Sequence, residues 1–193
     1  MRGDTRNRIL ATAETLLLTW GYQGFSYHHV AERLGIRPAA VHYHFPTKAD
    51  LGFALLQRYR ERFRWWAWQL HEQKARPEAC LEHFITLERR LLERDRVCPL
   101  SVVCVEMRGV SDTIRAEAQR LFEDARLWLE TVLESGRHSG AFTFDGHASE
   151  RALVVLAVLQ GALQLARLVG TEAFDTLREQ LRRELGMIPA DAS

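Results

Sequence analysis

Apolar residues recur at spacings of three and four along almost the whole 193-residue chain. This is the period of a helix that buries one side. No stretch keeps the alternation of apolar and polar residues that a half-buried strand needs. The predicted fold class is therefore all-α.

Charge is unevenly distributed along the chain. Residues 1–64 hold 10 Lys and Arg against 5 Asp and Glu, whereas residues 65–193 hold 16 against 20. Attraction to phosphates depends on local positive charge and not on the overall net charge, which is only +1. This pattern indicates that the N-terminal segment meets a polyanion such as DNA.

Two short helices are predicted between Ser26 and Lys48. Ser26 caps the first, Gly35 ends it, Pro38 fits the first turn of the second, and Pro46 stops the second. The second helix carries small alanines and side chains with hydrogen-bonding tips, and it lacks acidic residues, which suits a recognition helix in the major groove. Two ordinary surface helices joined by a glycine turn remain the alternative from this pattern alone.

A wider pattern favours DNA binding. The stretch from Arg8 to Leu56 combines I-L-x-x-A, G-Y, S-x-x-x-V-A-x-x-x-G-I and, in part, the motif Y-x-H-F-P-x-K. Together these motifs resemble the DNA-binding domain of the TetR family of bacterial regulators. The resemblance implies a three-helix, helix-turn-helix DNA-binding domain over residues 1–50. It also implies a larger helical effector-binding and dimerisation domain over 51–193, with a helix over about 48–70 linking the two.

The resemblance also implies a function: a sequence-specific DNA-binding regulator that is not an enzyme. The odd number of cysteines and the charged N-terminal stretch lead us to expect a cytoplasmic protein. We expect a homodimer that represses from a palindromic double-stranded DNA operator until a small-molecule effector releases it. Phe25, Pro38, Ala40 and His42 depart from the residues usual in the family, which leaves the operator sequence open. The positions that the resemblance assigns to DNA binding are Ser26, Arg37, Pro38, Ala39, Ala40, His42, Tyr43, His44 and Lys48.

Two long apolar helices are predicted in the C-terminal part, over about 111–135 and 147–170, with Asp145 as the cap of the second. Each is too apolar for one buried stripe, so we expect them to pair with a second copy of the chain. Two central helices of a monomer are the alternative. The stretch Ala152–Val169 approaches the length of a membrane span, but Gln160, Gln164 and Arg167 interrupt it. We interpret it as a buried helix and expect no membrane contact.

The effector pocket is predicted from aromatic residues of the helix that links the two domains and from glutamines on the apolar helix over about 147–170. Core packing is the alternative for the aromatic residues, and hydrogen bonding across a dimer or exposure to solvent is the alternative for the glutamines. The predicted effector-binding residues are Phe63, Trp66, Cys104, Met107, Gln160 and Gln164.

Three cysteines without a C-x-x-C pair indicate neither a disulfide framework nor a zinc site. We expect no metal and no cofactor. Cys98 before Pro99, with Cys104 six residues later, resembles a subset of TetR-like regulators that includes sensors of electrophiles or oxidants. Regulation by modification of Cys98 or Cys104, with Cys98 as the redox candidate, is therefore an alternative hypothesis, against that of small buried side chains. A small helical enzyme is another reading, but no nucleophile, base and orienting group stand in a recognisable order. A DNA-binding dimer without an effector is a third reading.

Overall fold

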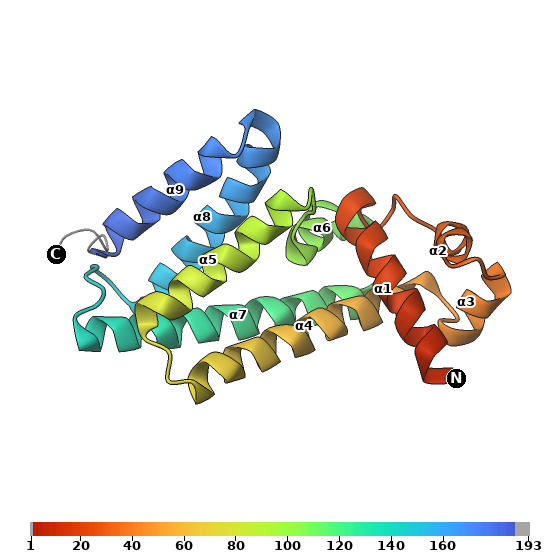
Figure 1. Cartoon of the computed structure of the whole chain (residues 1–193), viewed down its shortest axis with the longest axis horizontal. Coiled ribbons are helices and arrows are strands. Elements are labelled where there is room, and N and C mark those ends of the chain that lie inside the picture. The colour runs from red at the N-terminus through yellow and green to blue at the C-terminus, as the bar shows by residue number, and fades with distance from the viewer. Residues whose placement is uncertain (1, 188–193) are drawn as a thin grey trace. The chain divides into compact units, whose positions relative to one another are not determined.

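The computed structural model describes residues 2–187, and this part of the chain contains nine α-helices, one 3-10 turn and no strand (Figure 1). The predicted all-α class is confirmed. The elements are α1 (Arg2–Trp20), α2 (Tyr27–Leu34), α3 (Pro38–His44), α4 (Lys48–Glu72), α5 (Pro77–Glu93), α6 (Pro99–Val105), η1 (Met107–Gly109), α7 (Asp112–Ser139), α8 (Ala148–Val169) and α9 (Glu172–Glu184).

The helices form two compact units. Unit 1 comprises the chain up to Phe63 together with Arg96–Phe122, and unit 2 comprises Arg64–Asp95 and the chain from Glu123 on. Residues from the middle of the chain thus belong to the same unit as the N-terminal helices. Two helices, α4 and α7, begin in unit 1 and end in unit 2.

Unit 1 has one apolar core that joins α1, α2, α3 and the start of α4. Ile9, Val30, Val41 and Leu55 are each fully buried in it. The predicted helix ends in this region are confirmed. Ser26 is the N-cap of α2, Gly35 ends it in the left-handed conformation at φ +64°, and Pro38 opens α3.

The long helix α4 begins with a reciprocal cap. The backbone N–H of Thr47 donates to the Asp50 carboxylate at 2.9 Å, and the backbone N–H of Asp50 donates to the Thr47 hydroxyl at 3.1 Å. The cap fixes the direction in which the chain leaves the two short helices.

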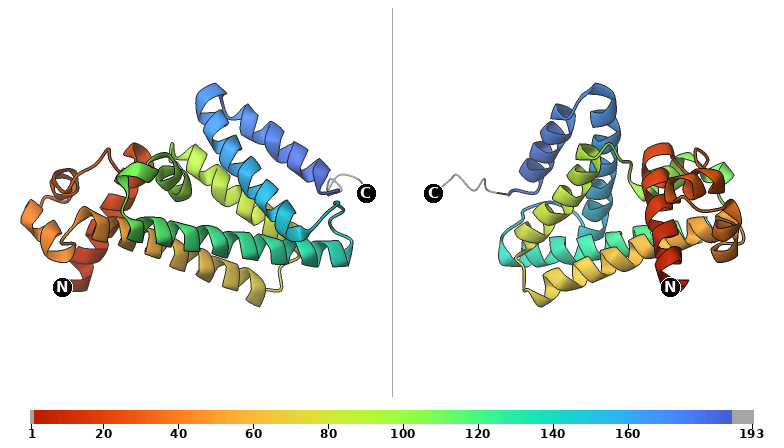
Figure 2. Two further views of the ribbon diagram at one scale, coloured as in Figure 1. Left: turned by 180° about the vertical axis from the view of Figure 1, so that it is seen from behind. Right: turned by 45° about the vertical axis from the view of Figure 1, so that its right-hand side comes forward.

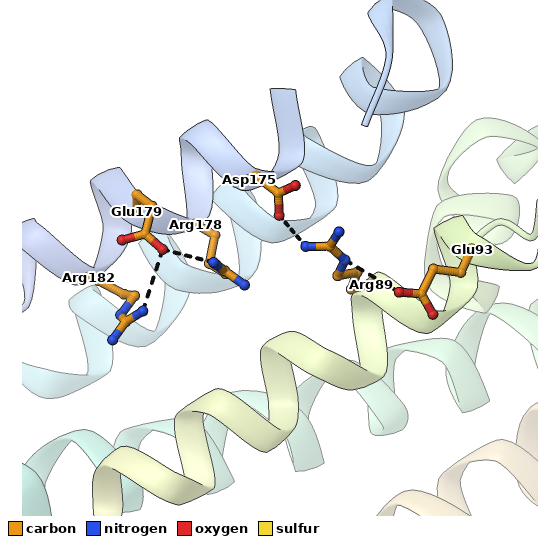
Figure 3. Close-up of polar contacts among 6 residues, drawn as sticks. All are labelled: Arg89, Glu93, Asp175, Arg178, Glu179 and Arg182. Carbon is orange, nitrogen blue, oxygen red and sulfur yellow. Dashed lines mark hydrogen bonds and ion pairs between the residues drawn. The ribbon is translucent and has the colours of Figure 1, made fainter. Parts of the chain in front are cut away.

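Unit 2 contains α5, α8 and α9, together with the later parts of α4 and α7, and the ribbon views show α8 and α9 as neighbouring helices (Figure 2). Ion pairs attach α9 to α5. Arg89 contacts Asp175 and lies 3.4 Å from Glu93 (Figure 3). Arg182 lies 3.1 Å from Glu82. Phe174 and Leu181 of α9 are buried in unit 2.

The predicted N-cap of α8 is wrong by two residues, although the predicted range of about 147–170 agrees with the observed helix. Its N-cap is His147 and not Asp145, and the backbone N–H of His147 lies 3.4 Å from the Glu150 carboxylate. Gly146, at φ +84°, turns the chain after Asp145 and delays the helix. Among the described residues, α8 is the one helix long and apolar enough to cross a membrane by composition. Eight of its residues are buried within the protein, however, which agrees with the predicted core helix.

Candidate nucleic-acid interface

The outer side of α3 is exposed and carries no carboxylate. Val41 faces the core and is fully buried, whereas Ala39, His42 and Tyr43 are exposed, with Tyr43 showing 65% of its surface. Pro38 and the preceding Arg37 are exposed as well, and Ala40 and His44 are half-buried. The structure therefore brings the predicted contact residues of α3 onto one accessible, amphipathic element of the size that enters a major groove.

Tyr27, which the sequence interpretation did not select, fixes the position of α3. Its hydroxyl donates to the backbone carbonyl of Phe45 at 2.7 Å, and its ring meets that of His42 edge-on at 4.5 Å. Burial raises the pKa of Tyr27 to about 12, so the hydroxyl stays a donor at neutral pH. The signal in the sequence was only an aromatic residue directly after the Ser26 cap.

Lys48 and Ser26 lie at the edges of this surface. The ammonium of Lys48 sits over the rings of Tyr22 and Phe25, at 4.7 and 4.9 Å from their centroids. Burial lowers the pKa of Lys48, and the nearby Glu106 carboxylate partly opposes this effect. Ser26 is half-buried, and its backbone N–H donates to Nδ1 of His29 at 3.2 Å.

A carboxylate from far along the chain holds the loop between α1 and α2. Glu106, just after α6, accepts backbone N–H groups from Tyr22 at 2.9 Å and from Gln23 at 2.6 Å. The side-chain amide of Gln23 in turn donates to the carbonyl of Gly109 at 2.8 Å. Gly21 has φ +80°, and a Cβ there would lie 2.2 Å from a Glu106 oxygen. We call these contacts the Glu106 bracket.

Comparison with known proteins identifies this arrangement. Residues 9–55 match the family described as bacterial regulatory proteins, tetR family, and residues 77–184 match the C-terminal domain described as transcriptional regulator LmrA/YxaF-like. The chain belongs to the TetR family. It is therefore a DNA-binding transcriptional regulator and not an enzyme.

Relatives within the TetR family match along most of their length. The chain is 22% identical to the HTH-type transcriptional repressor NemR of Escherichia coli over 193 residues, covering 98% of this chain and 96% of NemR. It is 23% identical to the HTH-type transcriptional regulator LmrA of Bacillus subtilis, with 85% and 87% covered. A TetR family regulator from Agrobacterium tumefaciens has a solved structure that matches with a TM-score of 0.88 at 29% identity, covering 94% and 97%.

The residues predicted to bind an effector fall into both units. Phe63, Cys104 and Met107 belong to unit 1, where the last two are exposed. Trp66, in unit 2, packs in a ring cluster with Phe84 and Trp128, at 6.2 and 4.8 Å between centroids.

The two predicted glutamines lie on α8, in unit 2. Gln160 is half-buried, whereas Gln164 is exposed on the same side as Leu165 and Leu168. Gln164 therefore points away from the buried side of α8.

The two cysteines of the alternative hypothesis differ in access. The Cys98 side chain is 5% exposed at the start of α6, whereas Cys104 is exposed near the end of the same helix. Reaction with a dissolved electrophile requires access to the sulfur. Cys104 meets this condition and Cys98 does not.

Proposed function

We propose that this TetR-family protein is a cytoplasmic repressor that binds a palindromic operator as a homodimer and is released by a small-molecule effector. The observation that carries the proposal is the outer side of α3, which is exposed, free of carboxylates and supported from behind by Tyr27. The names of two relatives, a repressor and a regulator, agree with it.

The proposed DNA contacts are divided between bases and backbone. Ala39, Ala40, His42 and Tyr43, on α3, approach base edges, because small residues allow close backbone approach and larger ones carry hydrogen-bonding tips. The flanking residues contact phosphates and set the register; these are Ser26, Arg37, Pro38, His44 and Lys48.

One recognition helix covers only a half-site, so a second copy is required. The surface proposed for this pairing is the exposed side of α8, where Leu153, Val154, Leu165 and Leu168 are between 41% and 81% exposed. Gly161, between them, leaves room for a partner helix to approach. A helix that buries one apolar side and exposes another is expected to cover the second one in an isologous interface.

The sequence predicts that α7 also contributes to the dimer interface, but its exposed side in unit 2 is less apolar than that of α8. Arg126 forms ion pairs there with Glu123 at 2.6 Å and Glu130 at 2.9 Å. These charged side chains surround the exposed Leu127. We therefore assign the apolar part of the dimer interface to α8.

Release by an effector requires that the effector binds the DNA-incompetent state more tightly than the operator-bound state. The continuous helices α4 and α7, shared by the two units, are the proposed route of coupling. Among the effector residues predicted from the sequence, Gln164 lies on the side of α8 that is proposed for dimerisation. The others remain part of this proposal: Phe63, Trp66, Cys104, Met107 and Gln160.

The test is selection of bound duplexes from a random DNA pool, followed by titration of the best site. We expect an enriched palindrome, and we expect Tyr43→Ala to weaken its binding at least tenfold, whereas His83→Ala, an exposed change in unit 2, leaves affinity unchanged. Weak binding without sequence preference would refute operator recognition.

Modification of a cysteine is a second candidate for the switch, and the exposure of Cys104 favours it over Cys98 as the reactive position. Under this alternative, N-ethylmaleimide releases the operator from the wild-type protein and from Cys98→Ser but not from Cys104→Ser. Equal release from all three proteins, or from none of them, excludes it.

A further inference from the structure

A cleft in unit 2 combines apolar walls with a single permanent cation. Its volume is about 490 Å³, and it lies between the end of α4, the start of α5 and the middle of α7. This is the size range of small-molecule sites. The lining includes Trp68, Leu70, His71, Lys74, Cys80 and Trp128, and no Asp or Glu is among its lining residues.

One wall of the cleft is held in place before any ligand arrives. Trp128 packs between Trp66, at 4.8 Å, and Phe84, at 5.5 Å between ring centroids. Trp68, on the opposite helix, is 56% exposed. Trp68 and Trp128 both line the cleft, and a fixed aromatic wall together with an accessible indole suits a flat ring system, which can bind without reordering the wall.

The lining next to these rings is uncharged. The thiol of Cys80 lies 3.7 Å from the carbonyl of Ala75, and burial, followed by the nearby Glu78, raises its pKa. The thiol therefore stays neutral, and the charge of the cleft comes from Lys74, with His71 beside it.

Lys74 occupies a position where glycine is the ordinary residue. It lies just after α4 at φ +51°, and the N–H of the next residue, Ala75, donates to the carbonyl of Leu70 at 3.0 Å. This hydrogen bond is typical of helices that end at a left-handed glycine, so the side chain of Lys74 at this position carries a steric cost. Lys74 lines the cleft and is exposed to solvent, so its ammonium is available to an anionic group of a bound ligand.

We propose that this cleft binds flat aromatic carboxylates, with the ring system against Trp68 and Trp128 and the carboxylate paired with Lys74. Its role as the effector site rests on the proposed function, whereas the binding itself does not. Neutral aromatic compounds bind more weakly, because they leave the ammonium without its partner.

The test uses 1-naphthoate and its neutral counterpart 1-naphthalenemethanol, titrated into the full chain by calorimetry at pH 8. We expect 1-naphthoate to bind at least tenfold more tightly than the alcohol. Lys74→Gly and Lys74→Met abolish this preference, and Arg94→Gln, which removes an exposed charge outside the cleft, retains it.

Folding is monitored in the same proteins. Glycine adopts positive φ without steric cost, so the melting temperature of Lys74→Gly stays equal to that of the wild type or rises, while its naphthoate affinity falls. Opposite changes in stability and affinity cannot come from a damaged fold. Equal binding of the two probes to the wild type, or an unchanged preference in Lys74→Met, overturns the proposal.

Measurement of operator binding distinguishes a failure of the proposed ligand site from a failure of the proposed function. Operator binding is measured first without a probe, because its absence refutes the proposed function and leaves the binding result intact. With operator binding established, we expect 1-naphthoate to weaken it in the wild type and not in Lys74→Gly. Naphthoate that binds through Lys74 without changing operator affinity overturns the effector role of the cleft.

Discussion

At the scale of single residues, the contact with the greatest consequence for unit 1 is made by Glu106. The neighbouring helices α1 and α2 are separated by a loop whose backbone N–H groups would otherwise depend on water. The Glu106 carboxylate accepts two of them and also lies close enough to Lys48 to counter the burial effect on the lysine pKa. One side chain thus orders the loop in front of the recognition helices.

Replacing Glu106 tests the bracket. We expect Glu106→Ala to lower the free energy of unfolding by about 1 to 2 kcal/mol, because two donors lose a charged acceptor. Amide hydrogen exchange, followed by mass spectrometry, should accelerate in residues 21–24 in particular. Glu61→Ala, which removes an exposed carboxylate from α4, serves as the control and should change neither quantity. Unchanged exchange in the loop of Glu106→Ala would contradict the role assigned to the bracket.

Glu88 is the residue whose protonation links stability to pH. It lies on the same side of α5 as Leu81 and Ile85, both buried, and its Oε2 atom is shielded from solvent without a hydrogen-bond partner. Burial raises its pKa to about 7. A carboxyl group with a raised pKa in the folded state favours folding less as pH rises, because the unfolded chain releases its proton first.

The expected loss of stability begins near pH 4.5, the ordinary value for this side chain, and is complete above pH 7. Glu88→Gln removes the titration. Relative to the wild type it should gain roughly 2 to 3 kcal/mol between pH 5 and pH 8, measured by urea unfolding at fixed protein concentration. Glu72→Gln, at an exposed site, is the control. A difference that does not vary with pH would show that Glu88 is ionised without penalty.

At the scale of elements, the same substitution on α8 and on α7 is expected to affect dimerisation differently. Leu165 on α8 and Leu127 on α7 are equally exposed, at 47% and 48%, so the same substitution can be made on both helices. Arginine in an apolar interface loses its hydration without gaining a partner. We expect Leu165→Arg to sediment as a monomer at micromolar concentration and Leu127→Arg to remain a dimer. The opposite result would move the interface to α7.

The elements also show what the sequence could predict. Local signals located helix ends in unit 1, because caps and left-handed glycines act within a few residues, as at Ser26 and Gly35. Asp145 failed as a cap because the following Gly146 turns the chain before the helix begins. The Glu106 bracket was missed because it joins positions more than 80 residues apart, and spacing rules do not extend that far.

At the scale of the whole molecule, two long helices belong to both units, so the units share covalently continuous elements. Within unit 1, α4 is tied to α1 by Arg62 and Glu14, at 2.6 Å, and to α7 by Arg60 and Glu117, at 3.4 Å. Displacement of α4 is therefore expected to be passed to α1 and, through the core, to α3. The proposed coupling between effector and operator binding would act through these contacts, and it requires that they have two discrete arrangements.

The uneven charge of the chain gives the last prediction, because DNA binding by phosphate contacts depends steeply on salt. Each phosphate neutralised contributes about 0.9 to the slope of log affinity against log salt concentration. Arg37 is exposed at the start of α3, so Arg37→Ala should reduce the slope of the dimer by about 2.

The same experiment distinguishes two roles for Lys48, a phosphate contact and a purely structural one. If its ammonium reaches a phosphate, Lys48→Ala also reduces the slope by about 2. If its place over Tyr22 and Phe25 is purely structural, affinity falls but the slope does not change. We expect the first result, because a half-buried ammonium beside aromatic rings is poorly hydrated and loses little on meeting a phosphate. Electrophoretic mobility shifts from 50 to 300 mM salt measure both slopes, with Arg94→Gln as the control in unit 2.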